Sequence, residues 1–170
     1  IPRSGLCLTG EGALVFFWHG LTRVASDAVA PLFGLGPEVV DDIVASGGVV
    51  VSPEMEEGRA TGLGSLPWIS ATAGGFGEGD NKDDDFLVMD DVVACTIEHF
   101  DIDLRRIYST GMSAGGLQTG QVVRRRSGYL ASAVTFSGGM SGNPDDQDPD
   151  NKVPVAIFWG GPSDMVLGVQ

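Results

Sequence analysis

The alternation of short apolar runs with helical segments most constrains how this chain folds. Continuous apolar runs of about five residues are typical of strands buried on both faces of a parallel sheet. They occupy residues 13–18, 48–52, 106–110, 131–137 and 154–159. Segments of helical character lie between them at residues 37–46, 85–100 and 115–126. The order predicts an α/β fold, with a mostly parallel, doubly wound sheet and helices on both of its faces.

Size and charge narrow the class of protein further. The 170 residues fit one domain, predicted to span 1–170, and a chain of this length buries a core without needing disulfides. A net charge of −13 argues against a nucleic-acid partner, because phosphate contacts require clustered Lys and Arg. The longest strongly apolar run, 13–18, is far shorter than the ~20 residues of a membrane span, so none is expected. Whether Cys7 and Cys95 pair stays open, as does the oligomeric state.

The segment Gly111-Met112-Ser113-Ala114-Gly115 matches the G-x-S-x-G nucleophile elbow. A predicted strand precedes it and a predicted helix follows, so Ser113 falls on the sharp turn between them. Small neighbours suit this turn because strand and helix approach closely, and Gly111 and Gly115 supply them. The alternative is a glycine-rich turn with an idle serine. The context favours Ser113 as a nucleophile.

A second element, His19-Gly20-Leu21, ends the first apolar run. Acyl transfer requires two N–H donors for the oxyanion, one after the nucleophile and one in the loop after an early strand. Ala114 and Leu21 occupy those positions. His19 itself is interpreted as a structural residue that holds the loop.

A third element, Gly160 to Asp164, follows the last apolar run. Serine hydrolases on this kind of sheet place the triad acid after the nucleophile in the chain. Asp164 fits that order, although a turn-forming aspartate is the competing interpretation.

These three elements, together with Ile102-Asp103-Leu104-Arg105-Arg106-Ile107-Tyr108-Ser109-Thr110-Gly111-Met112-Ser113-Ala114-Gly115-Gly116, resemble the polyhydroxybutyrate depolymerase and feruloyl esterase branch of the α/β-hydrolases. The likeness runs over nearly the whole chain and is densest over residues 83–139. The resemblance implies a secreted serine esterase with Ser113 as nucleophile, Asp164 as acid, and Leu21 and Ala114 as oxyanion donors. It implies polymeric or small ester substrates and neither a metal nor an organic cofactor.

The catalytic histidine of that family should follow the acid, but no histidine follows Asp164. The two histidines present are His19, assigned to the loop, and His99, at the far end of a predicted helix. Family members usually carry a second His-Gly where this chain has Trp159-Gly160, and the family's first strands are missing or shortened here. We therefore expect an incomplete core, with the base on a segment outside these 170 residues, and little activity for the 170 residues alone.

Several side chains around the elbow have weaker interpretations. Trp68, Phe76 and Trp159 are candidates for an aromatic pocket wall, with ordinary packing the competing interpretation for each. The acidic stretches 80–85 and 145–150 contain oxygen ligands that suit Ca²⁺, but neither has EF-hand spacing, so solvated loops are favoured. Asp85 is expected to cap its helix.

Two other functions remain open from the sequence. One is a serine peptidase of the prolyl-oligopeptidase type, which also uses G-x-S-x-G-G. The other is an inactive module that keeps the fold and binds a carbohydrate or polymer in its cleft.

Overall fold

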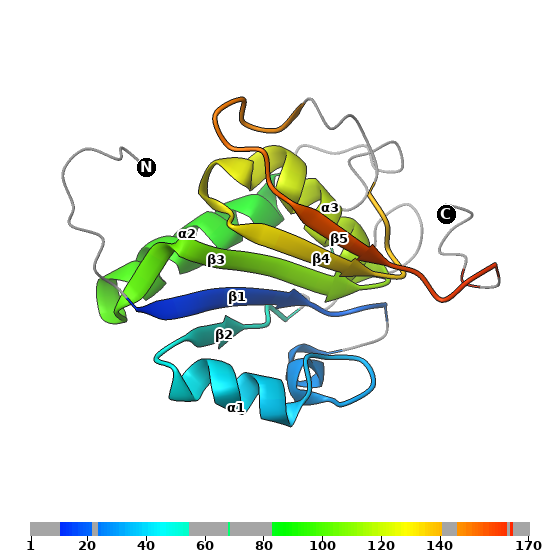
Figure 1. Cartoon of the computed structure of the whole chain (residues 1–170), viewed down its shortest axis with the longest axis horizontal. Helices are drawn as coiled ribbons and strands as arrows, with labels where there is room; N and C mark the ends of the chain where they lie inside the picture. Colours follow the sequence, from blue (N-terminus) through cyan, green and yellow to red (C-terminus); the bar gives the residue numbers. More distant parts are fainter. Residues whose placement is uncertain are drawn as a thin grey trace.

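Five parallel strands form one sheet (Figure 1). The computed structural model describes residues 11–21, 24–54, 68, 83–140, 146–162 and 164. Within them the sheet order is β2-β1-β3-β4-β5, and each neighbouring pair is parallel. The strands are β1 Gly12–Trp18, β2 Val49–Val51, β3 Ile102–Met112, β4 Ser132–Phe136 and β5 Val155–Phe158. The predicted α/β fold class is confirmed.

In the part of the chain that the structure describes, three α-helices connect the strands: α1 Pro37–Ala45, α2 Asp84–His99 and α3 Ala114–Arg126. Two 3₁₀ segments of the same part, η1 Ala25–Val29 and η3 Ser127–Tyr129, lie in the connections. The expected cap at Asp85 is wrong. Asp83 is the N-cap residue, and its carbonyl accepts the first helical hydrogen bond, from Leu87 N at 2.9 Å. Asp84 and Asp85 lie inside the first turn, where their charge suits the positive helix end.

The direction in which successive strands are added to the sheet reverses between β1 and β3. The chain moves outward from β1 to β2, then crosses back to β3 and continues to β4 and β5. Right-handed crossovers that travel in opposite directions put their helices on opposite faces of the sheet. The α2 and α3 crossovers therefore share one face, and α1 belongs to the other. In such sheets the crevice for a ligand lies at the carboxyl ends of the strands, where the order reverses.

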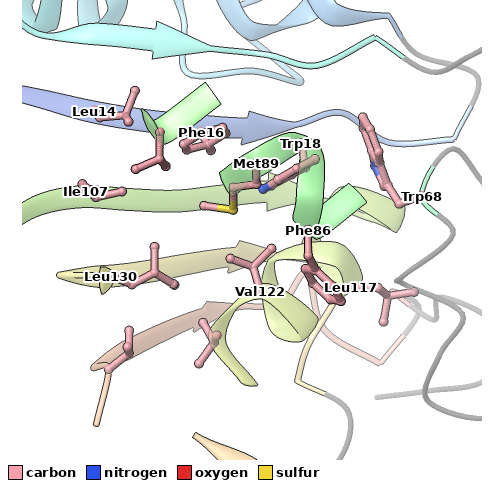
Figure 2. Close-up of a cluster of buried hydrophobic side chains, with 14 of the residues drawn as sticks. Leu14, Phe16, Trp18, Trp68, Phe86, Met89, Ile107, Leu117, Val122 and Leu130 are labelled. Atoms are coloured by element: carbon pink, nitrogen blue, oxygen red, sulfur yellow. The ribbon is translucent and has the colours of Figure 1, made fainter. Parts of the chain in front are cut away.

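The main core lies between the sheet and the α2–α3 pair (Figure 2). Leu14, Phe16 and Trp18 alternate along β1 and point into this cluster, where α2 contributes Phe86 and Met89. The intervening residues of β1 are buried as well, so both faces of this strand are covered. Helix α1 has no buried residue, and its Val39 and Val44 are 46% and 56% exposed, so this helix packs only loosely at the sheet edge.

Three arginines end α3 and pair with acidic side chains. Arg126 Nε lies 2.9 Å from both carboxylate oxygens of Asp90 on α2, and its guanidinium carbon lies 5.1 Å from the centre of the Phe86 ring. Arg124 pairs with Asp146, and Arg125 Nη2 lies 3.4 Å from Asp83 Oδ1. The pairs with Asp90 and Asp83 join α2 to the end of α3, where cationic side chains also suit the helix dipole. No helix among the described residues is long and apolar enough to cross a membrane.

Candidate active site

Ser113 occupies a strained turn between β3 and α3. Its backbone has φ 56° and ψ −119°, a left-handed conformation that serines seldom adopt and that costs on the order of 1–3 kcal/mol. Two hydrogen bonds fix the turn: Ser113 N donates to Phe136 O at 2.8 Å, and Leu117 N donates to Ser113 O at 3.0 Å. The Ser113 side chain does not cap the helix. The hydroxyl therefore stands at a fixed point at the start of α3.

The glycines around Ser113 are required by close contact between backbones. A Cβ at Gly115 would overlap with the carbonyl oxygen of Trp18, the last residue of β1. A Cβ at Gly111 would overlap with the backbone of Gly115. The first turn of α3 therefore lies directly against the end of β1, as the elbow motif predicts.

The loop after β1 lies beside the nucleophile. A Cβ at Gly20 would sit 3.5 Å from Ser113 Cβ and 3.3 Å from Met112 O. Leu21 follows directly and is 42% exposed, whereas Ala114 is the buried first residue of α3. The first N–H groups of a helix have no partner within it and carry its positive end. The structure thus brings together the two segments from which oxyanion donors were predicted.

His19 is anchored within that loop. Its ring is 1% exposed, and Nδ1 lies 2.9 Å from the carbonyl oxygen of Gly20, a contact that requires the Nδ1 proton. Trp68 packs against the ring and donates its indole N–H to His19 O at 2.9 Å. Glu54, which follows β2, places Oε1 3.8 Å from His19 Nε2 and accepts from Ala25 N at 2.9 Å through Oε2. These contacts hold the loop, and sequence reasoning missed Glu54 because its partners are distant in the chain.

Asp164 lies in a tight turn beyond β5. Its Oδ2 accepts a hydrogen bond from Gly160 N at 2.7 Å, and the Ser137 side chain supplies a second hydrogen bond. Its own N–H donates to Gly161 O at 2.9 Å, and its carbonyl accepts the indole N–H of Trp159 at 2.8 Å. The hydrogen bond from Gly160, followed by that from Ser137, holds the pKa of the Asp164 carboxyl below its usual value. A charged carboxylate therefore stands at this edge of the sheet.

The other candidates take different places. Trp68 is 3% exposed and belongs to the core, whereas Trp159 is half exposed beside Asp164. Phe76 lies outside the described residues. His99 ends α2 just before β3 begins, so the eleven residues of β3, about 35 Å of strand, separate it from Ser113. Neither histidine is placed to bridge Ser113 and Asp164.

The remaining polar features lie away from Ser113. A cavity of about 550 Å³ is lined by Asp90, Tyr129 and the three arginines of α3, at the opposite end of that helix. Within the described ranges, no three His, Cys, Asp or Glu side chains gather as metal ligands would. The acidic stretches 80–85 and 145–150 fall partly outside those ranges. Cys95 is a free, exposed thiol on α2, and Cys7 also lies outside.

Solved structures share this arrangement of strands and helices. A thermostable esterase aligns with 93% of this chain at 17% identity and a TM-score of 0.53. The protein sOPH aligns with 92% at 19% identity and a TM-score of 0.63, and a fluorophosphonate-binding serine hydrolase of Staphylococcus aureus with 94% at 14% identity and 0.54. The chain has the α/β-hydrolase fold.

This likeness concerns the fold. The chain spans 49% of the thermostable esterase and 60% of sOPH. No family model matches the sequence, and no curated protein matches it. The likeness is therefore to the architecture of the hydrolase core, and the roles of individual residues rest on the geometry above.

Proposed function

We propose that the protein is a serine esterase that hydrolyses carboxylic esters through an acyl intermediate on Ser113. The observation that carries the proposal is the left-handed backbone of Ser113 at a strand-to-helix turn, beside the Gly20 loop. Strain of this kind persists only where surrounding contacts enforce it, and it concentrates at functional sites. The structural neighbours include esterases and a serine hydrolase, which supports the same reaction class.

In the proposed reaction, Ser113 Oγ gives its proton to a general base and attacks the ester carbonyl carbon. The N–H groups of Leu21 and Ala114 stabilise the tetrahedral oxyanion, and the alcohol leaves with the proton from the base. Water then attacks the acyl-serine in the same way and releases the acid. Asp164 orients the base and stabilises its charged form.

The proposed base is a histidine outside these 170 residues. His19 is buried with Nδ1 engaged, and His99 stands at the opposite end of β3. A polyester or a hydroxycinnamoyl ester is the proposed substrate class, supported by the resemblance of residues 102–116 to enzymes acting on such esters.

The test uses the intact protein, a p-nitrophenyl ester and a fluorophosphonate probe. Ser113→Ala should abolish labelling and lower kcat by ~10⁵-fold or more, because the nucleophile is lost. Ser46→Ala, at the exposed end of α1, is the matched control and should keep both. Labelled protein that cleaves prolyl amides and no ester would indicate a peptidase. Wild-type protein that neither labels nor hydrolyses would indicate a binding module.

A further inference from the structure

The last residue of β4 and the residue after it contact both turns of the proposed site. Strand β4 lies between β3 and β5 in the sheet. Phe136 O accepts from Ser113 N at 2.8 Å, on the β3 side. Ser137 N donates to Phe158 O at 2.9 Å on the β5 side, and the Ser137 side chain hydrogen-bonds Asp164. Two consecutive residues therefore connect the turn of Ser113 with the turn of Asp164.

Ser137 has an unusual backbone for a serine. Among the residues that the structure describes, only Ser113 and Ser137 combine a positive φ with a side chain, at 56° and 53°. The conformation ends β4 and turns the chain toward Gly138 and Gly139, while the hydroxyl engages the carboxylate of the next turn. A glycine would adopt this backbone freely but would offer no hydroxyl.

The carboxylate of Asp164 needs more than one donor to be held in a single orientation. Gly160 N–H, at 2.7 Å from Oδ2, comes from the same turn and moves with it. The Ser137 hydroxyl comes from the residue that directly follows β4, and the residue before it, Phe136, accepts the hydrogen bond from Ser113 N. A carboxylate has about four lone-pair positions, so two donors leave room for an imidazole N–H.

We propose that Ser137 is a positioning residue that fixes the Asp164 carboxylate relative to the Ser113 nucleophile. The role rests on the proposed esterase function, in which Asp164 orients the base. The contacts of Ser137 are with Phe158 O and Asp164, so it is not assigned as a catalytic residue. Its effect passes through Asp164, and no signal in the local sequence indicates it.

Two substitutions separate the hydroxyl from the backbone. Ser137→Ala removes the hydroxyl and keeps the strained φ, whereas Ser137→Gly removes the hydroxyl and relieves the strain. Both should lower kcat on a p-nitrophenyl ester by about 10 to 100-fold with KM unchanged, the loss typical of removing a group that orients a catalytic one. Ser137→Gly should unfold no more easily than Ser137→Ala. Equal kcat losses despite unequal stability would assign the effect to the hydroxyl.

Two further readouts respond to positioning and not to folding. The pKa of Asp164, followed by carboxyl ¹³C NMR in the intact protein, should rise in Ser137→Gly because one donor to the charged form is lost. In an Asp164→Asn background, Ser137→Gly should cause no further loss of kcat, because the two residues act as one unit.

The outcomes distinguish this role from the function on which it rests. An active wild type with an equally active Ser137→Gly, or an unchanged Asp164 pKa in that variant, would overturn the positioning role and leave the esterase proposal standing. Additive losses in the double variant would also overturn it. A wild type with neither activity nor fluorophosphonate labelling would overturn both.

Discussion

Gly115→Ala tests whether the contact between α3 and the end of β1 sets the site. A Cβ at this position would meet the Trp18 carbonyl carbon and oxygen and, at 2.8 Å, the carbonyl oxygen of His19. All three are backbone atoms, so relief requires moving α3 or the loop that carries Gly20. Overpacking of this kind costs about 1–3 kcal/mol and sometimes more, against about 1 kcal/mol gained in helix propensity. Because three backbone atoms are hit at once, we expect a net destabilisation of about 2 kcal/mol.

Gly120→Ala is the matched control on the same helix. Its Cβ would lie 3.3 Å from the Met140 sulfur, which a flexible side chain can move, and 3.3 Å from the backbone oxygen of Gly139, which has to shift by only a few tenths of an ångström. The helix propensity of alanine then leaves this variant between neutral and about 1 kcal/mol more stable. The pair should therefore differ by about 2–3 kcal/mol.

Urea unfolding followed by tryptophan fluorescence measures the difference, since Trp18 is buried at the contact. For a domain of this size each kcal/mol corresponds to about 2–4 °C in Tm, so a thermal melt should separate the two variants by about 4–12 °C. Gly115→Ala should also lower kcat, because the Gly20 loop shifts from Ser113. Equal stability of the two variants would refute the argument that α3 and β1 are in forced contact.

Two further predictions concern the core and pH. Trp18→Phe should lower the free energy of unfolding in urea by about 2–4 kcal/mol, because it leaves a cavity and removes the 3.1 Å hydrogen bond from the indole to Ser109 Oγ. Trp159 is half exposed, so Trp159→Phe should lower it by less than about 1 kcal/mol. Equal losses for the two variants would contradict the burial of Trp18. The pKa of Asp164 is lowered in the folded state, so its stabilising effect is present above its ordinary value of about 3.9 and is lost as the pH falls through the folded value. Asp164→Asn should therefore be less stable than wild type at pH 6 by urea unfolding, and the difference should shrink as the pH falls below about 3.9. A difference that does not change with pH would contradict this.

The sequence predicted the strands best where both faces are buried. Residues 13–18 were predicted as a strand and β1 runs from Gly12 to Trp18, because each of its side chains is apolar or small and is covered. The start of β3 was missed because Asp103 and Arg105 interrupt the apolar run. Asp103 is buried but accepts from Arg105 N, Nε and Nη2 at 2.9 to 3.0 Å, so a local pair satisfies its charge within the strand.

In the candidate site, the geometry of one turn is set by residues close in the sequence and that of the other by residues far apart. The geometry around Ser113 depends on glycines within a few residues of it, so the motif contains the information that the turn requires. The environment of Asp164 depends on Ser137, which is brought there by the pairing of Phe136 with Phe158 and by the stacking of their rings 5.1 Å apart. A slip of one residue in that pairing would move Ser137 away from the turn and reverse the faces of β5. The register between β4 and β5 cannot be predicted from a local sequence pattern, and it determines where the Asp164 carboxylate lies relative to Ser113.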